Sequence, residues 1–187
     1  MLIDKITKMK NYSLLVLVLL ISICADAQKI LVPVDKASKI HFVIKNFGFN
    51  TGGDFSGMKG NIRFNPDKPS TSNFDVSVDA PTIDTDNGLR DKHLKKEDYF
   101  DVIKYPLIRL ASKKVEATNL AGTYKFTGDL TLKHITKPVT FLFKAIARDN
   151  GYFFEGDFRV NRLDYTVGNK SATLSNDVRI YLSALAK

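Results

Sequence analysis

Apolar and polar residues alternate with a period of two, in one short run after another, from Ser38 to the C-terminus. In the run 74–78 (FDVSV), three apolar residues are separated by an aspartate and a serine. Side chains of a β-strand point alternately to its two faces, so this pattern predicts strands that each bury one face. About eight such runs are present, at 40–44, 58–64, 74–80, 108–111, 124–132, 139–147, 154–160 and 178–184.

Turn-forming residues separate these runs at short intervals. They are Gly52-Gly53, Asn65-Pro66-Asp67, the segment 119–122 and Asp149-Asn150-Gly151, of which the last is a strong hairpin signal. Short turns join neighbouring strands antiparallel, and exposed edges of a long sheet promote aggregation, which favours closure. The sequence therefore predicts an all-β fold of about eight strands, an antiparallel sandwich or barrel, of which the closed barrel is favoured. The run 139–147 is apolar on both faces, and we expect its outer face to be covered as well.

One segment interrupts the alternation. Residues 88–100 (GLRDKHLKKEDYF) contain good helix formers and no β-branched residue. Asp86 or Asn87 is available to cap the first turn. We therefore expect a short helix or paired turns that cross between two strands, over one mouth of the barrel.

The first 27 residues read as an export signal rather than as part of the barrel. Three lysines precede an apolar run, Leu14 to Cys24, that is short for a membrane span, and Ala25-Asp26-Ala27 supplies a small-residue cleavage site. We predict cleavage after Ala27, a periplasmic protein, and one domain over residues 28–187. A retained membrane anchor or acylation of Cys24 are the alternatives, although Ile23 is a poor fit before an acylated cysteine.

Composition limits the partners and the chemistry. Cys24 is the only cysteine, so the exported chain has no disulfide and must be stabilised by burial. The formal net charge is +8, but the basic residues are spread along the chain. Export argues against nucleic acid as a partner. The charge fits transient contact with an anionic membrane surface, and simple solvation explains it equally well.

The sequence gives little support for catalysis or for metal binding. The three histidines, His41, His93 and His134, are far apart in the sequence, and no G-x-S-x-G motif is present. The segment after Asp84 begins like a calcium loop, but Lys95 stands where the bidentate glutamate is required. We therefore predict no enzyme activity, no metal and no cofactor.

Four stretches together resemble the YceI-like family of polyisoprenoid-binding, lipocalin-like proteins. The first is Ile83 to Pro106, with Ile83-Asp84-Thr85, Arg90-Asp91, His93-Leu94, Tyr99-Phe100-Asp101 and Tyr105-Pro106; the others are Gly57 to Asn65, Gly128 to Thr140 and Asn161 to Val178. They occur in the family's order, and the similarity runs from about Val34 to the C-terminus. Two departures stand out. Tyr99 replaces a common phenylalanine, and His134-Ile135 replaces a turn that usually contains glycine.

The resemblance implies an eight-stranded lipocalin-like barrel with a helical insertion and a long hydrophobic tunnel in a periplasmic protein. It also implies that the tunnel holds an amphiphile such as an isoprenoid chain or a quinone. The expected function is binding, sequestration or transport of that lipid without catalysis. The alternative is a fully packed barrel that binds an envelope or respiratory partner through its outer surface. A monomer and a homodimer both remain open.

Strand parity and the resemblance together give a set of candidate site residues. The expected tunnel lining is Phe42, Ile44, Met58, Ile62, Phe64, Phe74, Leu110, Phe126, Phe143 and Phe158. Ordinary core packing is the competing interpretation of each of these. Arg90, Asp91 and His93 are the candidates for head-group contact at the tunnel mouth. For this cluster the alternative is structural: Asp91 pairs with Arg90 or caps the insertion and fixes it on the barrel.

Overall fold

The computed structural model describes residues 28–187. The predicted signal peptide, its cleavage site and Cys24 therefore lie outside the described residues. Ten strands form one antiparallel sheet in the order β1-β4-β5-β6-β7-β8-β9-β10-β2-β3. Their bounds are β1 Ile30–Leu31, β2 Lys39–Asn46, β3 Phe49–Phe55, β4 Lys59–Arg63, β5 Asn73–Asp79, β6 Leu107–Ala117, β7 Thr123–Leu132, β8 Ile135–Arg148, β9 Gly151–Asn161 and β10 Leu174–Ala186.

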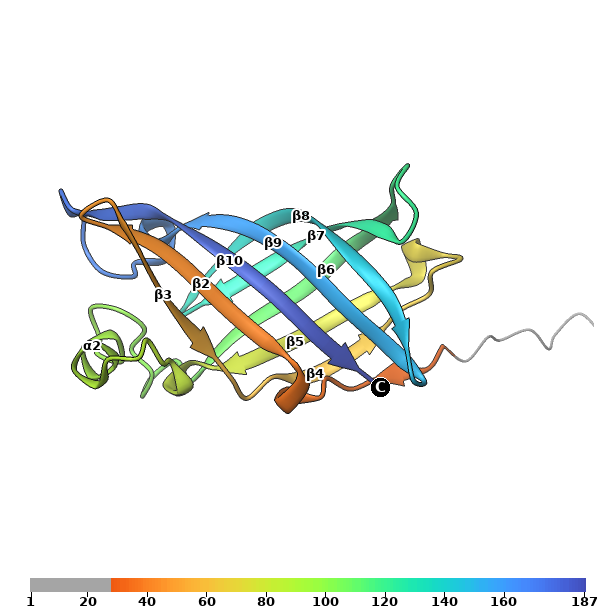
Figure 1. The fold of residues 1–187 in the computed structure, drawn as a ribbon, viewed down its shortest axis with the longest axis horizontal. Coiled ribbons are helices and arrows are strands. Elements are labelled where there is room, and N and C mark those ends of the chain that lie inside the picture. The colour runs from red at the N-terminus through yellow and green to blue at the C-terminus, as the bar shows by residue number, and fades with distance from the viewer. Residues whose placement is uncertain (1–27) are drawn as a thin grey trace, which may run out of the picture.

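The sheet curls into an elongated barrel (Figure 1), and hydrogen bonds close it near both ends. Near the two ends of the described chain, residues 28 and 187, the segment after β1 pairs with the end of β10, where the Val32 amide donates to the Lys187 carbonyl at 2.8 Å. Toward the other end, Asp54 of β3 exchanges backbone hydrogen bonds with Asp84 of the insertion. The predicted all-β antiparallel barrel is thus confirmed.

The strand count differs from the prediction, with ten strands in place of eight. The two additional strands are β1, which is only two residues long, and β3. Gly52-Gly53 suggested a turn, but both glycines lie inside β3. A Cβ atom at Gly53 would lie 2.6 Å from the Thr85 methyl group. Glycine is therefore required there by the close approach of the insertion, not by a change of chain direction.

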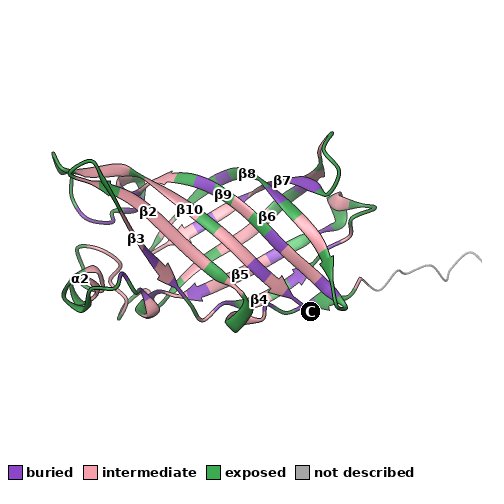
Figure 2. Cartoon of the chain, viewed as in Figure 1, coloured by how far each residue is buried: buried purple, intermediate pink, exposed green. Residues whose placement is uncertain are grey.

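Burial follows the alternation that the sequence predicts, as the coloured strands in Figure 2 show. In β7, Tyr124, Phe126 and Leu130 are buried while Lys125 is exposed. The expectation that the outer face of 139–147 is covered is wrong. Leu142 in β8, whose side chain is on the outer face, is 53% exposed.

The chain between β5 and β6 forms the insertion over one end of the barrel. It contains a short 3-10 helix, Ala80–Thr82, and helix α2, Gly88–Leu94, followed by turns. The Asn87 side chain caps α2 by accepting hydrogen bonds from the amides of Leu89 and Arg90. The predicted helical insertion and one of its two candidate caps are confirmed. Remaining 3-10 turns are Asp35–Ala37, Pro69–Thr71 and Arg162–Tyr165.

Antiparallel connectivity places several loops at the same end of the barrel as α2. They are the β2–β3 turn at Phe47-Gly48, the β7–β8 turn at Lys133-His134 and the segment 162–173 between β9 and β10. Figure 1 shows α2 and the β2–β3 turn together at the left, away from the C-terminus. We call this the α2 end, and the opposite one the terminal end.

Candidate functional site

A cavity of about 360 Å³ lies inside the barrel. Its wall is formed by side chains from β2 to β10 and from the insertion, and most of them are aliphatic or aromatic. The barrel interior is therefore not fully packed. The volume lies within the range of small-molecule sites, about 300–1,000 Å³. Such an apolar space accommodates the hydrocarbon part of a ligand and excludes charged groups from its centre.

The structure brings most of the predicted lining residues together around this cavity. Nine of the ten line it, namely Phe42, Ile44, Met58, Ile62, Phe74, Leu110, Phe126, Phe143 and Phe158. The exception is Phe64, which is buried but does not contact the cavity. Whether these nine side chains bind a ligand stays a prediction, because their position is equally compatible with forming the core of the barrel.

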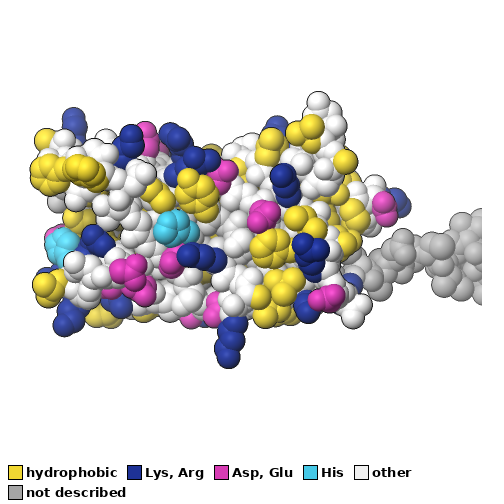
Figure 3. All heavy atoms as spheres, in the orientation of Figure 1, with side chains coloured by type: hydrophobic (Ala, Val, Ile, Leu, Met, Phe, Trp, Pro, Cys, Tyr) yellow, Lys and Arg dark blue, Asp and Glu magenta, His cyan; other side chains and the backbone are white. Residues whose placement is uncertain are grey.

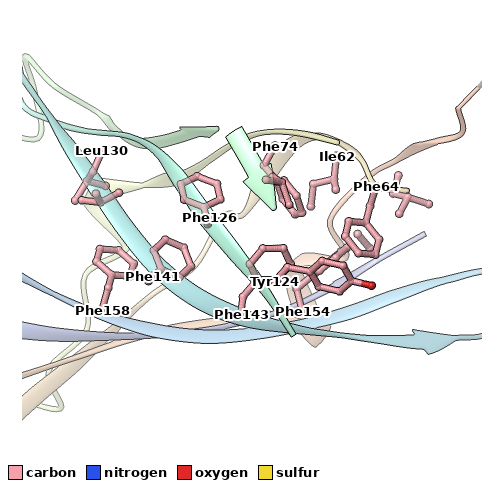
Figure 4. Close-up of a cluster of buried hydrophobic side chains, with 14 of the residues drawn as sticks. Ile62, Phe64, Phe74, Tyr124, Phe126, Leu130, Phe141, Phe143, Phe154 and Phe158 are labelled. Carbon is pink, nitrogen blue, oxygen red and sulfur yellow. The ribbon is translucent and has the colours of Figure 1, made fainter. Parts of the chain in front are cut away.

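Phe64 instead lies in a cluster of aromatic rings that closes the cavity toward the terminal end. Its ring centroid is 4.9 Å from that of Tyr152, 5.0 Å from Tyr124 and 5.3 Å from Phe154, all at steep edge-to-face angles. Phe64 also borders a surface depression formed with the β8–β9 turn on the outer side of the cluster. Figure 4 shows Phe64 at one end of the row of buried rings, with Phe158 and Leu130 at the other. We call Phe64, Tyr124, Tyr152 and Phe154 the aromatic plug.

We expect Phe64→Ala to destabilise the barrel and to extend the cavity through the plug. Truncation of a buried phenylalanine costs about 3–5 kcal/mol. The space that it vacates lies between the cavity and the surface depression, so longer hydrocarbon chains should now fit. The measurement is urea denaturation together with retention of amphiphiles of increasing chain length. Phe47→Ala, which changes an exposed phenylalanine, is the matched control. An unchanged chain-length preference would contradict the role of the plug.

The α2 end of the cavity is more polar. Here the wall includes Arg90 and His93 from α2, Thr85 from the insertion, and Asn46 and Thr51 from the β2–β3 hairpin. His93 both lines the cavity and is exposed to solvent. Because the polar lining residues gather at the α2 end while aromatic rings close the terminal end, we take the α2 end as the mouth of the cavity.

Arg90 and Asp91 both bind Thr85, which is buried beneath α2. The Arg90 Nε donates to the Thr85 hydroxyl at 2.8 Å, and a second guanidinium nitrogen donates to the Thr85 carbonyl. Asp91 Oδ1 accepts from the Thr85 amide at 3.0 Å and from its hydroxyl. Asp91 is not among the residues that line the cavity, and its contact with a head group stays a prediction. These contacts with Thr85 hold α2 on the preceding segment of the insertion, which the Asp54–Asp84 backbone hydrogen bonds join to β3. They agree with the alternative in which the pair has a structural role, with Thr85 as the shared partner.

We expect Asp91→Ala to loosen the insertion without unfolding the barrel. The variant leaves the buried Thr85 amide and hydroxyl without their acceptor, at a cost of about 1–3 kcal/mol. Hydrogen exchange should become faster in 80–95 and remain unchanged in β7 and β8. Asp98→Ala, which removes an exposed carboxylate from the same insertion, is the control. Equal hydrogen-exchange rates in the parent and in both variants would contradict the role of Asp91 in holding the insertion.

Arg162 is a mouth residue that sequence reasoning missed. It lines the cavity, is only 4% exposed, and donates to the carbonyls of Val167, Asn169 and Ser175 at 2.8–2.9 Å. Within residues 28–187, no carboxylate oxygen lies within 4.0 Å of its guanidinium. Burial lowers the pKa of Arg162 below its usual range, but an arginine remains charged at neutral pH. The mouth therefore contains a buried positive charge that no carboxylate neutralises.

A tyrosine next to this arginine adds a neutral polar group. Tyr165 lines the cavity, and burial raises the pKa of its phenol to about 12. It therefore stays protonated at neutral pH. Both residues lie between β9 and β10, outside the alternating runs, so periodicity gave no indication of either side chain, and an arginine in a loop is normally exposed. The mouth thus combines a charged donor and a neutral hydroxyl beside an apolar interior.

The histidines do not converge on a common site. His41 Nδ1 lies 2.6 Å from Asp54 on the outer wall, His93 packs 4.7 Å from the Tyr99 ring, and His134 lies near Tyr105. In the described part of the chain, no three His, Cys, Asp or Glu side chains are placed to share a metal ion. No helix among the same residues is long and apolar enough to cross a bilayer.

Together, the antiparallel sheet, the helical insertion and the apolar cavity define a lipocalin-like barrel. Residues 33–186 match the YceI-like domain, and the chain belongs to the YceI-like family. The resemblance seen in the sequence is thus confirmed.

Relatives and solved structures agree with this assignment. A UPF0312 protein of Pseudomonas paraeruginosa is 32% identical over 151 residues, which is 77% of this chain and 78% of the relative. The crystal structure of BcnA from Burkholderia cenocepacia has the same fold, with a TM-score of 0.78 and 21% identity over 83% of this chain and 99% of BcnA. A polyisoprenoid binding domain from Saccharophagus degradans shares the fold at a TM-score of 0.65 and 13% identity, over 84% of this chain and 97% of that domain.

Proposed function

We propose that this protein binds an isoprenoid-type amphiphile, such as a polyprenol or a quinone, and sequesters or carries it in the periplasm without catalysis. The observation that carries the proposal is the apolar cavity with one polar mouth. Membership of the YceI-like family supports it, as does the shared fold of a domain described as polyisoprenoid-binding. The lipid is a ligand and not a cofactor.

The geometry favours one orientation of the ligand. The hydrocarbon chain points toward the aromatic plug, and the head group lies at the mouth near Arg162, Tyr165 and His93. Burial of one five-carbon isoprene unit gains roughly 3–4 kcal/mol before losses, at about 0.8 kcal/mol per methylene group. Ordering of a flexible chain offsets part of that gain. The unneutralised charge of Arg162 favours a head group with oxygen acceptors over a plain hydrocarbon.

The alternative of a packed interaction module has less support. It requires an interior filled by side chains, whereas this interior retains about 360 Å³. Several lining residues, including Ile44 and Leu110, are only half-buried although they point inward. They are incompletely covered because they face the cavity. A carrier explains this arrangement, and a surface-binding module does not need it.

The proposal is tested by native mass spectrometry of the protein purified without detergent. Organic extraction and identification of the extracted lipid follow. A stoichiometric long-chain amphiphile is the expected result. A protein that is empty and also refuses added quinones and prenols would overturn it and favour the interaction module.

The mass of the purified chain also tests export. Cleavage after Ala27 leaves Gln28 as the first residue, while a lipoprotein begins with an acylated Cys24. Recovery of the chain with its leader intact in the cytoplasm would contradict the periplasmic assignment.

A further inference from the structure

The most exposed hydrophobic side chains of the described chain all lie at the α2 end. Phe47 is 71% exposed, Phe49 77%, Leu89 81% and Ile103 95%, and no other large hydrophobic residue among 28–187 exceeds 60%. Phe47 and Phe49 flank the tip of the β2–β3 hairpin, Leu89 lies on α2, and Ile103 lies in the turns before β6. Figure 3 shows yellow side chains at this end, beside dark blue lysine and arginine. We call these four residues the apolar rim.

Phe47 occupies a backbone conformation that does not suit it. Its φ is 50° and that of Gly48 is 81°, so both central residues of the hairpin turn have positive φ. Asparagine or glycine is favoured at the first of these positions, and a bulky residue there is an outlier. Phe47 contributes little to the core, because most of its surface is in solvent. Folding alone therefore gives no reason for an aromatic side chain at this turn.

Lysines accompany the rim. Lys45 precedes the hairpin tip, Lys92 lies one helical turn after Leu89, and Lys104 follows Ile103; all three are exposed. Acidic residues of the insertion, such as Glu97 and Asp98, are interspersed, so the end is amphipathic and not uniformly basic. Apolar tips with adjacent lysines suit the interface of a bilayer, where rings enter the head-group region and ammonium groups meet lipid phosphates.

We propose that the apolar rim docks this protein on an anionic lipid bilayer, with the cavity mouth facing the membrane. This inference rests on the proposed function. The rim lies at the same end of the barrel as Arg90 and His93, which line the cavity. A docked barrel lets an amphiphile move between bilayer and cavity without exposing its hydrocarbon chain to water. The terminal end, which the aromatic plug closes, faces away from the membrane.

The test measures binding of the protein to vesicles of phosphatidylglycerol with phosphatidylethanolamine. The protein is used in the form that cells produce. The rim variant combines Phe47→Asn, Phe49→Thr, Leu89→Gln and Ile103→Ser. Asparagine suits the positive φ of residue 47, so the barrel should remain folded. We expect vesicle partitioning in flotation assays to fall at least about tenfold, equivalent to about 1.4 kcal/mol. Leu120→Asn, at the terminal end, is the matched control and should bind like the parent.

Two further measurements separate this inference from the proposed function. Native mass spectrometry after incubation with an added prenol reports the binding capacity of the cavity, which the rim variant should retain, since none of the four residues lines the cavity. Vesicles of phosphatidylcholine alone should bind the parent more weakly than anionic vesicles.

Equal vesicle binding by the parent and the rim variant would overturn the docking inference. A rim variant that instead converts a dimer to a monomer, with unchanged vesicle binding, would overturn it in favour of an interface between two copies. An empty parent would count against the proposed function alone.

Discussion

In a variant that combines Ile44→Trp with Leu110→Trp, we expect bound lipid to fall below detection while the barrel remains folded. Ile44 lies on β2 and Leu110 on β6, and both side chains line the cavity. Because both are half-buried and face open space, an indole ring at either position enters the cavity more readily than it displaces core side chains. Two indoles should narrow a cavity of about 360 Å³ enough to obstruct a hydrocarbon chain. Overpacking costs about 1–3 kcal/mol per site, which a barrel of this size tolerates.

The measurements for this variant are lipid content by native mass spectrometry, uptake of an added prenol, and circular dichroism. Leu142→Trp is the matched control, because Leu142 lies on the outer wall of β8 and does not line the cavity. It should keep the parent's lipid content. Full lipid occupancy in the folded double variant would show that the ligand site lies elsewhere.

The second large effect concerns Arg162. We expect Arg162→Met to lower the free energy of unfolding by about 3–5 kcal/mol, because three backbone carbonyls lose their donors together. Those carbonyls, of Val167, Asn169 and Ser175, hold the segment between β9 and β10 against the mouth. Arg162→Lys should lose less, since an ammonium group can reach only some of these acceptors.

Guanidinium denaturation followed by circular dichroism measures this effect. Arg159→Met provides the control, because Arg159 is an exposed residue of β9 and its loss should change stability by no more than about 0.5 kcal/mol. An Arg162→Met variant within about 1 kcal/mol of the parent would contradict the role of the guanidinium in this loop.

Strand parity predicted most of the cavity lining for a simple physical reason. In a closed barrel, one face of every strand points inward, so alternation assigns residues such as Phe42 and Phe158 to the interior without knowledge of the contacts. Parity does not determine how far along the barrel axis an inward-facing residue lies. Phe64 has the same parity as Ile62, yet it lies in the plug while Ile62 lines the cavity.

The insertion shows a different limit. Its composition predicted a short helix or paired turns with a cap at Asp86 or Asn87, since both depend on local sequence, and Asn87 is the cap. The roles of Arg90 and Asp91 depend on Thr85, whose burial beneath α2 arises only when the insertion folds onto β3. Likewise, β3 was missed because Gly53 meets the insertion at Thr85, and this contact joins segments about thirty residues apart along the chain.

The sequence by itself determined the all-β barrel, its antiparallel connectivity, the helical insertion and the family. All of these depend on periodicity, turn residues and local motifs. Only the tertiary structure decided that the interior is hollow, that the terminal end is closed by aromatic rings, and that the mouth carries the buried charge of Arg162. These features depend on where side chains from distant strands meet in space. The volume left inside the barrel depends on how all of these side chains pack together, so it cannot be read from any single segment of the chain.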